Sequence, residues 1–173
     1  MRTVVLGDSR EIRELIEQRR RTGADLYDEM WEGEYHMAPA PHRSHGLLDY
    51  RLGRILGPLA DRAGLFGSGP FNLGDQFDYR VPDQGYHPDE APRTWVPTAA
   101  VVVEIVSPDD ESWAKLDFYA AHEVDEVLIV DPEARRVTWL VRDGAGYAVA
   151  DGSALLGITT AGLASQIDWP PVA

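Results

Sequence analysis

Three residues of this 173-residue chain have the types and the order needed for metal-dependent hydrolysis. Asp83 follows a proline at the end of an expected strand, and Glu104 comes 21 positions later inside an apolar, β-branched segment. Lys115 follows 11 positions after Glu104, at the start of an expected helix. A carboxylate inside a buried strand is expensive to desolvate unless a cation or several hydrogen bonds meet it. The order acid, acid, lysine around a sheet therefore predicts a metal-ion site, and hydrolysis of phosphodiester bonds is the reaction to test against it.

Hydrolysis of a phosphodiester with a metal ion needs hard oxygen ligands that leave positions for a phosphate oxygen and a water. Asp83 and Glu104 supply two carboxylates, and the backbone carbonyl of Ile105 is a third candidate ligand. Lys115 could lower the pKa of the attacking water, orient it, or stabilise the charge that develops on phosphorus. Glu34 is a candidate for an additional catalytic acid at the border of the same site.

Each of these residues also has a purely structural interpretation. Asp83 could form a turn after its proline, because aspartate often bonds to the backbone in turns. Glu104 could form a buried ion pair with an arginine, and Lys115 could be an ordinary solvated helix residue. The combined order of the three residues favours the metal site over these separate explanations.

The elements that must position these residues follow from the hydrophobic pattern. Residues 8–21 predict a short helix, and residues 25–37 predict a hairpin around Glu32-Gly33. Leucines and isoleucines at spacings of three and four predict a long helix over residues 44–63. Residues 76–81 resemble a strand, and the proline-rich segment 84–98 predicts a loop.

The second half of the chain has the clearer pattern. Residues 99–106 and 126–130 predict two strands with a helix over residues 111–122 between them, as a parallel pair with a crossover requires. Residues 136–149 predict a hairpin, and a short strand and helix follow. We therefore expect the α/β class, with a mixed central β-sheet flanked by helices in one domain over residues 1–173.

Composition limits the classes of partner. The net charge of −13 lowers the expectation of tight, non-specific DNA binding, which depends on clustered Lys and Arg. The one dense basic stretch, Arg19–Arg21, is also explained as the solvated end of a helix. The absence of cysteine excludes disulfides and thiolate metal sites. No apolar segment approaches the roughly 20 residues that cross a bilayer, and no signal peptide is expected, so we predict a cytoplasmic protein without membrane contact.

Several motifs together resemble the Uma-type family of "putative restriction endonucleases", within the PD-(D/E)XK nuclease superfamily. The match covers about residues 24–139 and is most specific in its second half. It rests on these segments: Gly33-Glu34 with Met37-Ala38-Pro39, His45 at the head of the long helix, Val81-Pro82-Asp83, the stretch 103–108, Lys115 with Tyr119, and the stretch 124–133.

The resemblance implies a restriction-endonuclease-like fold in which Asp83 and Glu104 bind Mg²⁺ or Mn²⁺. It implies that Lys115 is the catalytic lysine, moved to the helix after the strand, since Val106 occupies the position where the simplest superfamily motif has lysine. His45, Tyr119 and Ser107 are candidates for a second layer around the site.

Two other functions stay open at this point. The acidic surface and the displaced lysine also fit a catalytically inactive binding or scaffold domain that keeps the nuclease fold, because a fold does not determine a function. A hydrolase of a smaller phosphoester would tolerate an acidic surface better than an enzyme for duplex DNA. If DNA is the substrate, a homodimer is expected, because two sites cut both strands of a duplex more easily than one.

Overall fold

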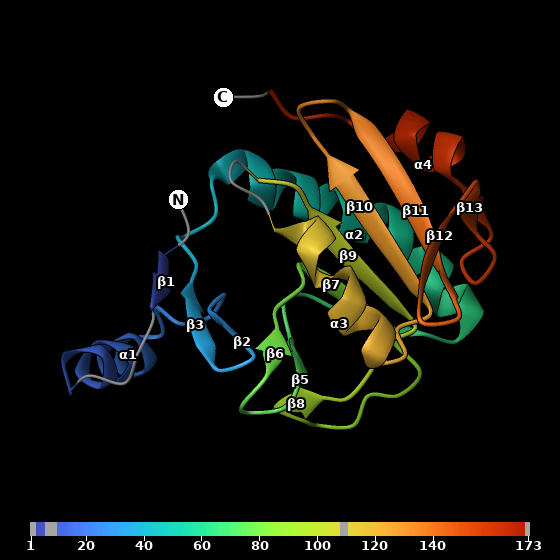
Figure 1. The fold of residues 1–173 in the computed structure, drawn as a ribbon. Helices are drawn as coiled ribbons and strands as arrows, with labels where there is room; N and C mark the ends of the chain where they lie inside the picture. Colours follow the sequence, from blue (N-terminus) through green and yellow to red (C-terminus); the bar gives the residue numbers. More distant parts are fainter. Residues whose placement is uncertain (1–2, 6–9, 108–110, 172–173) are drawn as a thin grey trace.

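The computed structural model describes residues 3–5, 10–107 and 111–171. Within these residues the strands form two six-stranded sheets and one two-stranded sheet. Figure 1 shows helices on both sides of the sheet that contains β9 and β10, with the N-terminal strands beside it. The prediction of a mixed α/β fold with helices against a central sheet is confirmed.

The central sheet has the strand order β12-β11-β10-β9-β7-β4. Only β9 and β10 are parallel to one another in it, and the remaining neighbours are antiparallel. The register places Glu104 opposite Ile129. The strands are β4 (Phe66–Ser68), β7 (Gln84–His87), β9 (Val101–Ile105), β10 (Glu126–Asp131), β11 (Arg136–Asp143) and β12 (Gly146–Ala150).

Two layers of helix cover this sheet. The long helix α2 (Arg43–Ala63) packs on one face through Leu48, Leu52 and Leu56, which share one apolar cluster with alternate residues of β9. The other face is covered by a 3₁₀ turn, η1 (Ser112–Lys115), and by α3 (Leu116–Ala121). Tyr119 of α3 belongs to this second apolar cluster. The crossover from β9 to β10 runs through η1 and α3, as the strand–helix–strand pattern predicted.

The N-terminal half forms a second sheet with the order β1-β3-β2-β6-β5-β8. Its hairpin is the one predicted around Glu32-Gly33, and both turn residues have positive φ angles. Helix α1 (Arg10–Thr22) precedes the hairpin and has no buried residue. The strands are β1 (Thr3–Val5), β2 (Glu29–Trp31), β3 (Glu34–Met37), β5 (Asn72–Gly74), β6 (Tyr79–Arg80) and β8 (Trp95–Val96).

The C-terminal part completes the core on the α2 side. Strands β13 (Gly152–Ser153) and β14 (Ile158–Thr159) form the two-stranded sheet, and α4 (Thr160–Gln166) follows directly. Leu163 of α4 is fully buried in the same cluster as the leucines of α2. Among the described residues, no helix has both the length and the apolar character that a bilayer crossing demands.

Two local predictions were wrong. Residues 84–98, expected as a loop, contain β7 and β8, and β7 is buried between β9 and β4. Gln84 and Gly85 have low strand propensity, but pairing with Val103 and Val102 of β9 overrides this preference. The helix expected over residues 111–122 is divided between η1 and α3. This division matters because Lys115 is the last residue of the 3₁₀ turn.

Candidate active site

A pocket of about 630 Å³ lies at the carboxyl ends of β9 and β10. The N-terminal turn of α2 forms one wall, and η1 forms another. Asp83, Glu104, Ile105 and Lys115 all line it, although they come from three different segments of the fold. Loops at the carboxyl ends of parallel strands are a common place for sites in α/β proteins. The fold therefore brings the predicted acid, acid and lysine into one pocket.

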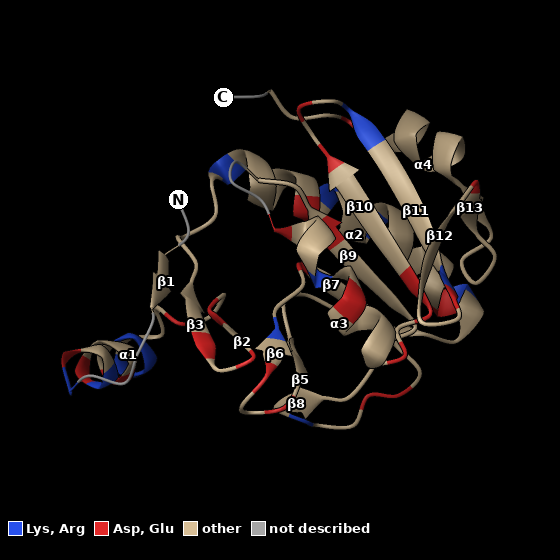
Figure 2. Ribbon diagram, viewed as in Figure 1, with Lys and Arg blue, Asp and Glu red and all other residues tan. Residues whose placement is uncertain are grey.

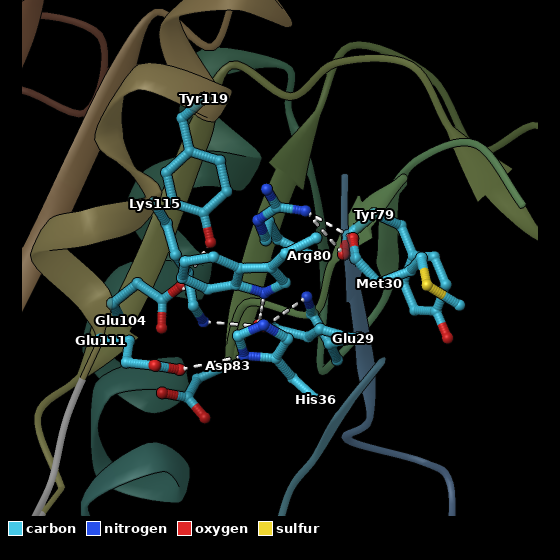
Figure 3. A network of polar contacts seen from close by, with 12 residues as sticks. Glu29, Met30, His36, Tyr79, Arg80, Asp83, Glu104, Glu111, Lys115 and Tyr119 are labelled. Atoms are coloured by element: carbon cyan, nitrogen blue, oxygen red, sulfur yellow. Dashed lines mark hydrogen bonds and ion pairs between the residues drawn. The ribbon is translucent and has the colours of Figure 1, made fainter. Parts of the chain in front are cut away.

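Glu104 and Lys115 form a buried ion pair inside this pocket. The Lys115 Nζ atom lies 2.9 Å from Glu104 Oε1, and both side chains are about 95% buried. The Tyr119 hydroxyl donates to the same carboxylate oxygen from one helical turn further along. The residue that is anomalous in an apolar strand is thus met by a cation and a hydrogen-bond donor, and Figure 3 shows the three side chains converging.

A second buried glutamate holds the other side of the lysine. Glu29 of β2 is completely buried, and its Oε1 atom lies 2.9 Å from Lys115 Nζ. The same oxygen accepts a hydrogen bond from the Val81 backbone N–H at 2.8 Å, and Oε2 accepts one from Trp31 Nε1 at 2.7 Å. One carboxylate therefore positions both the lysine and the segment that leads into Asp83.

Sequence reasoning missed Glu29. It lies 75 positions before Glu104 and belongs to the other sheet, so no spacing rule connects the two residues. The sequence feature that could have identified Glu29 is the predicted hairpin, because alternation along β2 places Glu29 and Trp31 on one face. An acid and a tryptophan that share a face can hydrogen-bond, which would have marked Glu29 as a residue with partners.

Asp83 is held by bonds to two other elements. Its Oδ1 atom lies 2.8 Å from His45 Nε2 in α2, and its Oδ2 atom accepts the backbone N–H of Ile105 at 2.7 Å. The His45 Nδ1 atom lies 3.2 Å from Ser107 Oγ. His45 thus contacts Asp83 and Ser107 contacts His45, while a second-layer role for either residue stays a prediction. Both oxygens of Asp83 retain lone pairs, because each carboxylate oxygen accepts more than one bond.

The N-terminal sheet docks against α3 beside these residues. The Arg80 guanidinium lies 4.3 Å from the centre of the Trp31 ring and 4.0 Å from that of Phe118 in α3. His36 is buried and stacks on Trp31, with its Nδ1 atom 3.5 Å from Glu111 Oε2. Figure 3 shows Arg80 and His36 of this layer next to Glu29. The stacking connects β2, and hence Glu29, to the helix that follows Lys115.

The electrostatics of the pocket disfavour negative charge on Glu104. Burial raises the pKa of the Glu104 carboxyl to about 7, and the charges of Asp83 and Glu29 act in the same direction. Lys115 and the Tyr119 hydroxyl oppose this shift. Burial and the neighbouring Glu104 raise the pKa of Tyr119 well above its usual value, which keeps this hydroxyl a donor.

Asp83 also raises the pKa of the histidine beside it, which favours the charged form of that imidazole. Burial by itself would lower the pKa of His45, but the hydrogen bond to Asp83 and the charges of Asp83, Asp49 and Glu104 raise it overall. Burial also raises the pKa of Asp49, with a contribution from Asp83. The pocket thus holds more acidic groups than its cations neutralise.

Glu34 is the one predicted catalytic residue that lies elsewhere. It is exposed at the start of β3, paired with Trp31 across the hairpin, and it is not among the described residues that line the pocket. Strand alternation explains this, since Tyr35, the next residue, points inward and donates to Asp28. The N-terminal acid that contacts Lys115 is Glu29 instead.

The donor set fits a hard divalent cation in kind. Asp83, Glu104 and Ile105 border one pocket and offer the oxygen ligands that Mg²⁺ and Mn²⁺ prefer. Among the described residues, no group of three or more His, Cys, Asp or Glu side chains is arranged so that it could hold a metal ion. Magnesium sites that act on phosphates commonly use only one or two carboxylates, with water and substrate as further ligands. Two carboxylates are therefore sufficient for such a site.

The fold and the pocket define the restriction-endonuclease-like class of α/β domain. The family described as "Uma2: Putative restriction endonuclease" matches residues 14–159, and the chain belongs to this family. The chain is also similar in fold to a solved protein from Anabaena variabilis ATCC 29413, described as "a putative nuclease belonging to DUF820". The two share 14% identity with a TM-score of 0.65, over 80% of this chain and 90% of the other. No curated protein matches the chain.

Proposed function

We propose that this protein is a metal-dependent DNA nuclease that hydrolyses phosphodiester bonds. The observation that carries the proposal is the pairing of Lys115 with Glu104 in a pocket that Asp83 also lines. Family membership supports the same reaction class. We propose Asp83, Glu104 and the Ile105 carbonyl as ligands of Mg²⁺ or Mn²⁺. Such an ion, when bound, polarises the phosphate and lowers the pKa of a water.

The protein's own groups position and stabilise the reacting atoms. The water oxygen forms a bond to phosphorus while the bond from phosphorus to the leaving ester oxygen breaks, which yields a phosphate monoester and a hydroxyl. Lys115 stabilises the negative charge that develops on the phosphate oxygens. Glu29 holds the Lys115 amine at 2.9 Å, so this cation is in place before substrate enters. Preorganised charge of this kind needs no rearrangement during the reaction.

His45 and Tyr119 act through the two acids. His45 orients the Asp83 carboxylate, which also accepts the Ile105 backbone N–H. The Tyr119 hydroxyl fixes one oxygen of Glu104. Groups that hydrogen-bond to metal ligands in this way normally change metal affinity by about 10–100-fold when they are removed. We assign both side chains positioning roles.

The test is cleavage of DNA by the purified protein with Mn²⁺ or Mg²⁺, together with Mn²⁺ binding measured by titration calorimetry. Asp83→Asn should lose both Mn²⁺ binding and cleavage, and EDTA should stop the wild-type reaction. The exposed Asp89, which pairs with Arg93, supplies the matched control, and Asp89→Asn should behave as wild type. A wild-type protein that neither binds Mn²⁺ nor cuts DNA would contradict the proposal.

The inactive scaffold domain is the second candidate. It is favoured by the two carboxylates that hold the Lys115 amine, since a purely structural ion-pair network would have the same form. Such a domain would keep its fold and bind no Mn²⁺ at the pocket. The homodimer and the cytoplasmic location stay predictions from the sequence.

A further inference from the structure

The walls of the pocket carry an unusual excess of acidic groups. Lys115 is the only Lys or Arg among the described residues that line it, and its amine is already shared by two glutamates. Six acidic residues line the same space: Asp49, Asp83, Glu104, Glu111, Asp131 and Glu133. Two of them are the proposed metal ligands, so four acids remain on the walls. This inference rests on the function proposed above, because it concerns the substrate of the same site.

The residues at the edge of the pocket, which we call its rim, also lack a backbone N–H donor at many positions. Six prolines from four segments of the chain line the pocket: Pro39, Pro41, Pro70, Pro132, Pro170 and Pro171. Proteins bind DNA phosphates mainly through Arg, Lys, polar side chains and backbone N–H groups. Proline has no N–H, and a carboxylate repels phosphate. Large parts of the rim therefore cannot bind the phosphates that flank a scissile bond.

One wall differs from the others. The N-terminal turn of α2 contributes His42, Ser44 and His45, and His42 caps this 21-residue helix. The N-terminus of a helix carries partial positive charge that favours an anion. Together with Lys115, which lines the same pocket, this turn can receive one phosphate. The positive groups of the pocket are thus sufficient to bind a single phosphodiester group.

Duplex DNA cannot present one phosphate alone. Its two strands carry about one negative charge per 1.7 Å of helix axis, in fixed positions. A single strand can rotate its neighbouring phosphates away from Asp131 and Glu133 into solvent. Five of the 16 basic residues lie on α1, at one end of the molecule in Figure 2, and no Arg is among the described residues that line the pocket.

We propose that the pocket accepts flexible single-stranded DNA, one phosphodiester at a time, and discriminates against duplex DNA through its acidic rim. Wild-type protein with Mn²⁺ should cut a single-stranded oligonucleotide at least about tenfold faster than the duplex of the same sequence. Raising monovalent salt from about 50 to about 200 mM should narrow this preference, because salt screens the repulsion from the rim.

A matched pair of charge-reversal variants tests the rim directly. Glu133 is exposed at the pocket edge, whereas Asp143 is exposed at the opposite end of β11. Glu133→Lys and Asp143→Lys change the net charge by the same amount. Only Glu133→Lys should raise duplex cleavage, by roughly three- to tenfold, while single-strand cleavage changes little.

Binding is measured in parallel, by fluorescence anisotropy of labelled single-stranded and duplex oligonucleotides with the wild-type protein in EDTA, which prevents cleavage. Equal cleavage of the two substrates would overturn the inference and leave the nuclease assignment intact. An equal increase of duplex cleavage in Glu133→Lys and Asp143→Lys would do the same. If the wild-type protein cuts neither substrate, the nuclease assignment fails. The binding preference then decides the inference separately, and equal affinity for both forms overturns it.

Discussion

Glu104 and Glu126 are two glutamates in adjacent parallel strands, and each is only 3% exposed. Glu104 interrupts an apolar, β-branched segment and Glu126 begins one, and because both side chains are buried the same desolvation argument applies to both. Their surroundings differ. Glu104 contacts Lys115 and Tyr119 and lines the pocket, whereas Glu126 accepts one hydrogen bond from Trp139 Nε1 at 2.7 Å in the neighbouring strand.

The register of the sheet separates the two glutamates. Glu126 pairs with Val101 at the amino end of β9, and Glu104 lies three residues further along that strand. Alternation places Glu104 on the α3 face with Val102, and Glu126 on the α2 face with Leu128. The comparison shows that a buried acid in a strand indicates a site only when a cation and an open pocket accompany it.

The largest expected difference between the two residues concerns metal binding. Glu104→Gln should abolish Mn²⁺ binding and lower cleavage by roughly a hundredfold or more, because it removes a proposed ligand. Glu126→Gln should change both by less than about threefold, because this residue lies outside the pocket. Titration calorimetry and a cleavage assay measure the two effects. A comparable loss in both variants would remove the functional distinction between the strands.

The second difference concerns stability, because Glu104 depends on the buried cation Lys115 and Glu126 does not. Lys115→Gln leaves Glu29 and Glu104 facing each other in the interior, and it should lower the free energy of unfolding by about 3–5 kcal/mol. Saturating Mn²⁺ should restore part of this loss and raise Tm more than it does in the wild type, because the ion replaces the missing cation.

The double variant Glu29→Gln/Lys115→Gln is the control for that prediction. It removes one acid together with the lysine, so it should be more stable than Lys115→Gln alone. Chemical denaturation with and without Mn²⁺ measures each free energy. If the double variant is less stable than the single variant, Glu29 is not held as a charge by the lysine.

The Glu126 pair should matter for stability alone. Trp139→Phe removes the indole donor and should cost about 1–3 kcal/mol, because Glu126 then loses the hydrogen bond that compensates its burial. Replacing both partners in Trp139→Phe/Glu126→Leu should recover much of this loss. Mn²⁺ affinity should stay within about twofold of wild type in both variants. A larger change in affinity would show that the two faces of the sheet are coupled.

The sequence was sufficient for the parts of the site that lie within one continuous unit. Glu104, Lys115 and Tyr119 belong to a single strand–helix–strand crossover, whose hydrophobic period is regular and whose handedness is fixed. Asp83 was recognisable from the Val81-Pro82-Asp83 motif at the end of the strand expected over residues 76–81, although the strand that follows it was not foreseen. Local periodicity is informative wherever the interacting residues share one supersecondary unit.

The rest depended on contacts between distant segments. Glu29 contacts Lys115 only because the two sheets pack together, and Arg80 between two aromatic rings helps to hold them. Strand β7 escaped prediction because Gln84 and Gly85 have weak strand propensity, and Gly85 is needed where a Cβ atom would lie 2.3 Å from Phe71. Propensity describes single residues, whereas these positions are determined by their tertiary neighbours.

The smallest predicted effect concerns His45, which separates a positioning role from a ligand role in the same pocket. His45→Ala removes the bond to Asp83 Oδ1, but the Ile105 N–H still holds Oδ2. Mn²⁺ affinity should therefore fall only about tenfold, far less than in Glu104→Gln. His42→Ala is the matched control, since His42 lines the pocket and contacts Ser44 instead of Asp83. Complete loss of Mn²⁺ binding in His45→Ala would make this histidine a ligand, and an unchanged affinity would show that Ile105 alone orients the carboxylate.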